Sequence, residues 1–237
     1  MKRRTFDALR KAQADRIPAA LVTDLGTGFQ TVVTEATQQG DCALEDEFLP
    51  QVYEAIVKDR SGILEFYDGQ FFVNVLNSPL RMILVGAVHI AQALAPMASL
   101  AGYDVTVVDP RRAFATDERF PAIRLNGDWP DEALEALRPD RRTAIITLSH
   151  DPKLDDPALM TALSTPAFFI GALGSRKTHA ARLERMQTQG VQADRLTRIS
   201  GPVGLDIGAV TPAEIAISIL AEVTLALRGG PKHKAEG

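Results

Sequence analysis

Four short, uninterrupted apolar runs constrain the fold of this chain most strongly. They lie at residues 82–85, 105–108, 144–148 and 167–170. None shows the apolar–polar alternation of a half-exposed strand, so each is typical of a parallel strand buried on both faces. Helical stretches accompany them at 90–100, 131–137, 156–163 and 177–189. This repeated order of strand and helix predicts an α/β fold with a Rossmann-like, doubly wound parallel sheet.

The N-terminal third has a different pattern and predicts a small α+β segment. Helices are expected at 5–14 and 44–58, and strands at 19–24, 29–34, 63–67 and 71–76, with a hairpin turn at Asp68-Gly69. Pro79, after Asn77 and Ser78, marks a linker because proline and its neighbour resist regular structure. The sequence therefore predicts two domains, residues 1–78 and 79–237.

The last predicted helix has the clearest boundaries. Thr211-Pro212-Ala213-Glu214 is a capping box with proline in the first turn, and Gly229-Gly230 provides a stop. The apolar stretch 210–227 also contains Glu214 and Glu222, which favours an amphipathic helix over a membrane span.

Composition excludes several classes of protein. The hydrophobic share of 46% is that of a folded domain, and a net charge of −4 leaves no basic surplus for nucleic acid. A charged N-terminus indicates no secretory leader, and one cysteine, Cys42, permits no internal disulfide. Acidic neighbours disfavour its thiolate, so Cys42 is expected to be a small buried residue. We expect a cytoplasmic protein that binds neither nucleic acid nor membrane.

The loop after the first apolar run lies where a Rossmann fold has its phosphate turn. Gly86, Ala87, Val88 and His89 connect strand to helix, where backbone amides attract an anion. Asp109 ends the second run, and an acid at that position normally binds a ribose hydroxyl. Val88 replaces the second glycine of the fingerprint, and its side chain would narrow the approach of a pyrophosphate.

Two later strand ends add polar groups. Ser149, His150 and Asp151 follow the third run, and the sheet topology would place them beside the Gly86 turn. Gly174, Ser175 and Arg176 follow the fourth run, and offer amides, a hydroxyl and a guanidinium to an anion. Each group also has a structural interpretation: Asp151 as a helix cap, His150 as polar loop, and Arg176 as a solvated side chain.

Other polar residues allow two interpretations in the same way. Asp206, between Gly204 and Gly208, predicts a constrained loop with one buried polar group. Arg111 with Arg112 either holds a second phosphate or is a surface pair, whereas His179 is expected to be solvated. The candidate cofactor-binding residues are thus Gly86, Ala87, Val88, His89, Asp109, Arg111, Ser149, His150, Asp151, Gly174, Ser175, Arg176 and Asp206, with no catalytic residue or metal ligand among them.

Five motifs in this order resemble the XdhC/CoxI family, the accessory proteins of molybdenum hydroxylases such as xanthine dehydrogenase. They are residues 85–89, 108–112, 149–151, 170–176 and 201–215. The resemblance implies binding of molybdenum cofactor, as molybdopterin or its dinucleotide form. The protein would guard the cofactor while a sulfurtransferase installs its sulfido ligand, then pass it to an apo-hydroxylase, and it would act as a homodimer.

The resemblance also assigns roles to the loops. Anionic groups of the cofactor would use the Gly86 turn and Gly174 to Arg176, and Asp109, His150 and Asp151 would contact its polar edges.

The sequence departs from the family pattern in two ways. Members usually have glycine at the position of Val88, and a longer N-terminal domain with motifs that Gly40-Asp41-Cys42 and Glu45 match only loosely. The chain therefore resembles a shortened paralogue. Two alternatives stay open: an NAD(P)-dependent oxidoreductase, which a Tyr–x–x–x–Lys pair would have favoured but which is absent, and an adaptor that binds no cofactor.

Overall fold

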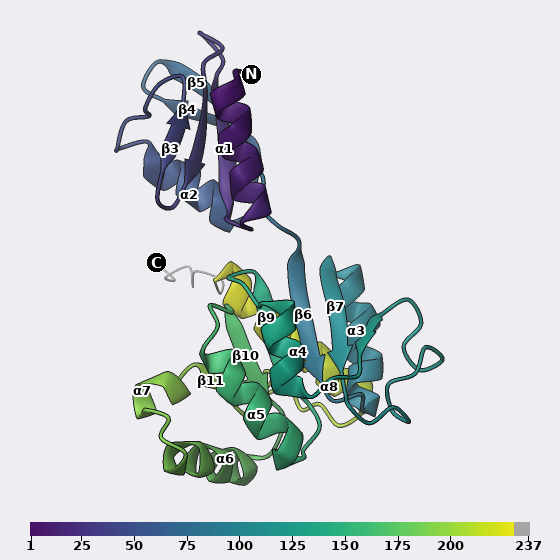
Figure 1. Cartoon of the computed structure of the whole chain (residues 1–237). Coiled ribbons are helices and arrows are strands. Elements are labelled where there is room, and N and C mark those ends of the chain that lie inside the picture. Colours follow the sequence, from purple (N-terminus) through teal and green to yellow (C-terminus); the bar gives the residue numbers. More distant parts are fainter. Residues whose placement is uncertain (230–237) are drawn as a thin grey trace. The chain divides into compact units, whose positions relative to one another are not determined.

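The computed structural model describes residues 1–229, and the chain divides into two compact units, Met1–Ser78 and Pro79–Gly237 (Figure 1). Residues 230–237 of the predicted second domain, including Gly230 of the predicted helix stop, lie outside the described residues. Within residues 1–229, no helix has the length and apolar character needed to cross a membrane.

A six-stranded parallel sheet forms the centre of the larger unit, in the order β11-β10-β9-β6-β7-β8. Its strands are β6 (Leu80–Val85), β7 (Tyr103–Val108), β8 (Arg124–Asn126), β9 (Thr143–Thr147), β10 (Phe169–Ala172) and β11 (Ile199–Ser200). This confirms the predicted Rossmann-like sheet. The strands β8 and β11 were not predicted, because three and two residues of mixed polarity give no apolar run.

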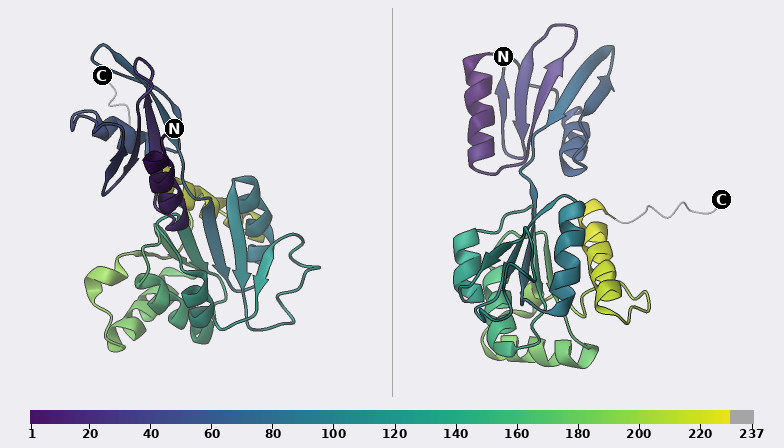
Figure 2. Two further views of the ribbon diagram at one scale, coloured as in Figure 1. Left: turned by 45° about the horizontal axis from the view of Figure 1, so that its top comes forward. Right: turned by 90° about the vertical axis from the view of Figure 1, so that its right-hand side faces the viewer.

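Helices cover both faces of this sheet (Figure 2). One face carries α3 (His89–Leu100) and α8 (Pro212–Arg228), and the other carries α4 (Pro130–Leu137), α5 (Pro152–Leu163) and α6 (Arg176–Thr188); a short helix, α7 (Ala193–Leu196), precedes β11. Strand β6 alternates between the two cores: Met82 packs with α3 and α8, and Ile83 packs with α4 and α5. Burial on both faces explains why its sequence is continuously apolar.

The predicted capping box of the last helix is present. The Thr211 hydroxyl accepts a hydrogen bond from the Glu214 amide at 3.3 Å, and the Glu214 carboxylate accepts one from the Thr211 amide at 2.8 Å. Hydrogen bonds from the backbone amides of Thr211 and Val210 lower the pKa of Glu214. The helix therefore begins at Pro212, as the sequence predicts.

The smaller unit is an antiparallel sheet of order β3-β2-β1-β5-β4 between two helices. Its elements are α1 (Arg3–Ala14), β1 (Ala19–Asp24), β2 (Gln30–Thr34), β3 (Gln38–Gly40), α2 (Leu49–Val57), β4 (Gly62–Phe66) and β5 (Gly69–Val75). Successive residues of β1 face opposite cores, Ala19 toward α1 and Ala20 toward α2. The α+β prediction is therefore confirmed.

Local details of this unit differ from the prediction. Helix α2 begins at Leu49 instead of Leu44, because Pro50 sets the first turn. The hairpin turn is Tyr67-Asp68 instead of Asp68-Gly69: Phe66 pairs with Gly69, and Tyr67 takes the left-handed conformation at φ +49°.

The neighbouring strands β6 and β9 bring two loops into close contact. Gly86 has a φ of +107°, and a Cβ atom built on it would lie 2.9 Å from the amide nitrogen of Ser149. The Leu148 amide donates to the Val85 carbonyl at 2.8 Å. A side chain at position 86 would therefore push the two loops apart.

This contact predicts a difference between two glycines of similar conformation. Gly102 has a φ of +91° with nothing within 4 Å of a built Cβ. Gly102→Ala should cost about 1–2 kcal/mol of unfolding free energy from backbone strain alone, and Gly86→Ala about 1–3 kcal/mol more from the clash. Urea unfolding followed by fluorescence of Trp129, the only tryptophan, measures both. Equal losses would contradict the close contact.

Candidate functional site

The candidate site lies at the carboxyl edge of the parallel sheet, where the strand order reverses. Strand β6 pairs with β7 on one side and with β9 on the other, so the loops that leave these three strands diverge at one point. Open α/β sheets bind ligands at such a switch point. Gly86 and Ser149, from two of these loops, lie in contact there.

The Gly86 turn is held by hydrogen bonds on both sides of Ala87. The Ala87 amide donates to Asp109 Oδ2 at 2.8 Å, and its carbonyl accepts from Arg119 Nη1 at 2.9 Å. Val88 precedes α3 without a side-chain cap, and its side chain packs partly against the apolar core. Exposed His89 begins the helix, and its first turn contains no acid. An anion therefore meets this helix terminus without competition from a carboxylate.

The side chain of Asp109 is committed to the protein itself. It is fully buried, and its two oxygens accept hydrogen bonds from the Ala87 amide, the Arg111 amide and the Arg111 guanidinium. Burial acts to raise the pKa of Asp109, but the hydrogen bonds from Arg111 and Ala87 together hold it below its usual value. The carboxylate predicted to read a ribose thus shapes the turn and orients Arg111.

The guanidinium of Arg111 reaches across the switch point. It forms a bidentate pair with Asp109 at 2.9 and 2.8 Å, and this hydrogen-bonded pair raises the pKa of Arg111. The charges of Asp151 and Asp155, on the β9 side, raise the pKa further. Arg111 is therefore a tethered side chain at the centre of the site, not one of a pair of solvated surface arginines.

The loop of Ser149, His150 and Asp151 is partly consumed by internal bonds. The Ser149 hydroxyl donates to Asp155 Oδ1 at 2.6 Å and accepts from the Asp151 amide at 3.0 Å. Asp151 caps α5 by accepting from the Lys153 amide at 3.0 Å. His150 has a φ of +61° and is exposed. Of the three side chains, His150 is the one left for an external ligand.

The loop after β10 presents a cation. Gly174 has a φ of +150°, and Ser175 caps α6 by accepting from the Thr178 amide at 3.1 Å. Arg176 is exposed and forms no hydrogen bond or ion pair within residues 1–229. Arg176 therefore offers its full set of donors to solvent or to a ligand.

Three expectations about exposure were wrong. Asp206 is exposed, although Gly204 and Gly208, at φ +110° and +75°, do constrain its loop as predicted. Cys42 is exposed because its loop lies outside the core of the smaller unit. His179 is half-buried against Gly201, and burial lowers its pKa.

A buried ion pair beneath these loops was missed. Arg182 of α6 is 2% exposed and donates from Nη2 to the Leu173 carbonyl at 2.9 Å. The same atom lies 3.6 Å from Oδ2 of Asp155, which is 1% exposed and accepts from Ser149 through its other oxygen. The pair thus links the β9 loop to the β10 loop. The spacing of Arg182 and buried Met186 on one helical face was the available signal.

The pair stays chemically demanding because several of its atoms lack partners. Arg182 Nε and Nη1, Asp155 Oδ2 and nearby Thr147 Oγ1 are buried without a hydrogen bond. Burial raises the pKa of Asp155 and lowers that of Arg182. Such groups are costly unless both charges of the pair are retained.

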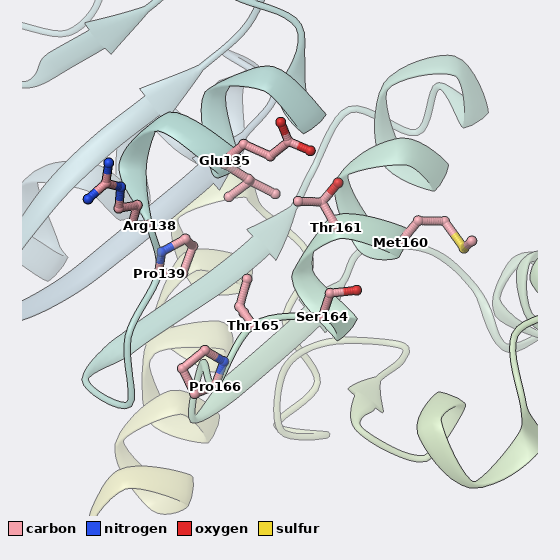
Figure 3. Close-up of a pocket in the computed structure, with 9 residues that line it drawn as sticks. Glu135, Arg138, Pro139, Met160, Thr161, Ser164, Thr165 and Pro166 are labelled. Carbon is pink, nitrogen blue, oxygen red and sulfur yellow. The ribbon is translucent and has the colours of Figure 1, made fainter.

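Hollows on the helices lie away from these loops. One of about 470 Å³ lies between the C-terminal ends of α4 and α5, lined by residues that include Arg138, Thr161 and Pro166 (Figure 3). Both helices end there and lead into the amino ends of β9 and β10, so this hollow is at the opposite edge of the sheet. Another of about 470 Å³ lies along α5 and α6, beside Asp156 and Arg185.

The described residues do not form a metal centre. No group of three His, Cys, Asp or Glu side chains comes close enough within residues 1–229 to hold an ion. The site offers hydrogen-bond donors, an arginine and a helix terminus, which suit an anionic ligand.

Comparison with known proteins places this geometry in a family. A family model described as the XdhC Rossmann domain matches residues 82–223, which include every strand end discussed above. The chain belongs to the XdhC family. The match covers β9, β10 and the loops of the candidate site, and it extends into α8.

Named XdhC-like relatives are all longer than this chain. It is 35% identical over 182 residues to the uncharacterized protein YqeB of Escherichia coli K12, 75% of this chain and 32% of that one. It is 33% identical over 144 residues to the E. coli molybdenum cofactor insertion chaperone PaoD, 61% and 39% of the two chains. For a probable xanthine dehydrogenase subunit from Bacillus subtilis 168 the values are 32%, 153 residues, 64% and 44%. The chain thus spans about a third to under half of each relative.

A solved structure shares the fold. The crystal structure titled as a xanthine dehydrogenase from Bacillus halodurans superposes with a TM-score of 0.69 at 24% identity, over 94% of this chain and 65% of that one. The superposition extends beyond the Rossmann-like unit, because that unit alone is a smaller share of the chain.

The buried pair predicts unequal effects of two matched substitutions. Arg182 and Arg185 both join α6 to α5, Arg182 at buried Asp155 and Arg185 at Asp156 near the surface, with Nε–Oδ2 at 2.7 Å. Arg182→Met should lower the unfolding free energy by about 3–5 kcal/mol, because it leaves a buried charge unpaired. Arg185→Met should cost about 1 kcal/mol or less.

Urea unfolding of both variants tests this, and the double variant Arg182→Met with Asp155→Leu serves as a check. It should regain part of the loss, since both charges are removed. Equal losses for Arg182→Met and Arg185→Met would show that the buried pair carries no special weight.

Proposed function

We propose that this chain is an accessory protein that binds molybdenum cofactor and assists its insertion into a molybdenum hydroxylase, without turnover of its own. The observation that carries the proposal is the convergence of the Gly86 turn, the β9 loop and Arg111 at one switch point. Membership of the XdhC family and similarity to PaoD, named as a molybdenum cofactor insertion chaperone, support the choice of ligand.

The residues present suit this ligand as cargo. Molybdopterin is a planar pterin that carries a phosphate, and the uncapped terminus of α3 together with exposed Arg176 can neutralise that phosphate. His150 and Asp206 are exposed and can contact polar edges of the ring system. The metal would stay on the ligands of its own cofactor, because the described side chains form no metal-binding cluster.

Chemical turnover has little support in these side chains. A nucleophile needs a base within hydrogen-bond reach and a third group that orients the base. Ser149 donates instead to buried Asp155, and His150 is exposed on the same loop. An NAD(P)-dependent oxidoreductase would also need a group to bind the ribose, and both oxygens of Asp109 already accept internal hydrogen bonds.

The partners follow from the same proposal. A molybdenum hydroxylase apo-enzyme would receive the cofactor, a sulfurtransferase would act on it while bound, and two copies of the chain would form a homodimer. Reversible binding suits such a carrier, because exposed polar groups on loops bind ligands without enclosing them.

The proposal predicts a specific effect at Arg176. Arg176→Ala should weaken molybdopterin binding by about 1.5–3 kcal/mol, the value of a charge-assisted hydrogen bond, with unfolding unchanged because the side chain is exposed. Lys177→Ala, at the exposed next position, removes the same charge and should change affinity much less. Fluorescence titration of the pterin measures both.

Reconstitution distinguishes the chaperone from its alternatives. An apo-hydroxylase supplied with molybdopterin should gain more activity with the unaltered chain than with Arg176→Ala. Identical affinities of the unaltered chain and Arg176→Ala would remove Arg176 from the site. Turnover of NADH or NADPH with a panel of carbonyl substrates would replace the chaperone with an oxidoreductase, and absence of any pterin binding would favour an adaptor.

A further inference from the structure

An exposed aromatic ring lies beside the phosphate turn, on the loop between β7 and β8. Phe114 is 43% exposed although its backbone is tightly held. Its amide donates to the Arg111 carbonyl at 2.9 Å, and its own carbonyl accepts from Arg119 Nη1 at 2.6 Å. That same Nη1 donates to the Ala87 carbonyl, so one nitrogen joins Phe114 to the turn.

Arg111 holds the ring from another direction. Its guanidinium carbon lies 4.7 Å from the centre of the Phe114 ring. Nε and Nη2 are fixed by Asp109, whereas Nη1 donates no hydrogen bond within the described residues. The guanidinium is thus a fixed plane with one donor atom available, in contact with a partly exposed ring.

We propose that Arg111 and Phe114 form a stacking platform for a planar heterocycle that bears a keto oxygen and is linked to a phosphate. The proposal deepens the proposed function and rests on it, since it places the ring of a ligand whose phosphate lies at the Gly86 turn. Aromatic faces and arginine planes stack on heterocycles, and Arg111 Nη1 can donate to the keto oxygen.

Charge at the switch point supports a neutral ring there. Asp151 and Asp155 act on Arg111 through space, and Asp109 pairs with it directly. Arg111 is therefore largely neutralised by carboxylates. A flat, uncharged ring fits this surface better than a second phosphate, which these carboxylates would repel.

Both a pterin and a nucleobase have this chemistry, so three probes are needed. Inorganic pyrophosphate tests the phosphate subsite alone, 6-hydroxymethylpterin pyrophosphate adds a pterin, and GDP adds a nucleobase. Calorimetric titration of the full chain gives the three dissociation constants. A preference for the pterin probe over GDP identifies the ring as a pterin, and the reverse identifies a nucleobase.

Phe114→Ala should weaken the better ring-bearing probe about 5- to 100-fold, the range for loss of one stacked aromatic, and leave pyrophosphate within about twofold. Phe114→Trp should retain or improve ring binding. Phe6→Ala is a matched control, because Phe6 of the smaller unit is 44% exposed and also lies beside an arginine, at 6.0 Å from Arg10. Phe6→Ala should change none of the three constants.

Two results would overturn the platform. One is that neither ring-bearing probe binds the unaltered chain more tightly than pyrophosphate. The other is that Phe114→Ala weakens pyrophosphate as much as the ring-bearing probes. If ring binding depends on Phe114 but the chain fails to activate an apo-hydroxylase, the platform stands and the insertion function fails. If the chain activates the apo-hydroxylase while its affinities ignore Phe114, the insertion function stands and the platform fails.

Discussion

The buried carboxylate of Asp109 is the interaction on which the candidate site depends. It accepts from the Ala87 amide on the phosphate turn and from the Arg111 guanidinium on the next loop. Without these bonds, a negative charge removed from water would be strongly unfavourable, so the turn and the arginine must both stay in place. Arg111 in turn contacts Phe114, and its charge interacts with Asp151 and Asp155. One carboxylate thus fixes the relative positions of two loops.

The fold was predictable because its strands are buried on both faces. Continuous apolar runs such as residues 82–85 and 144–148 have no other simple interpretation, and the capping box at Thr211 sets a helix start from four adjacent residues. The short strands β8 and β11 could not be predicted in this way, because partner strands stabilise them more than their own residues do.

The location of the site was also predictable, but the use of its side chains was not. Glycines and polar residues after apolar runs indicate loops at one sheet edge, and Gly86 does contact Ser149. Whether a polar side chain faces a ligand depends on partners distant in sequence, such as Ala87 for Asp109 and Leu173 for Arg182. Arg176, by contrast, is exposed as its position in the first turn of α6 allows.

The central claim is that a phosphate-bearing pterin binds at the switch point between β6 and β9. A crystal structure of the chain with molybdopterin tests it most directly, because the phosphate is the strongest marker of the ligand's position. The account predicts this phosphate within hydrogen-bond distance of the first-turn amides of α3 or of the Arg176 guanidinium. A phosphate bound instead in the hollow between α4 and α5, beside Arg138, would contradict it.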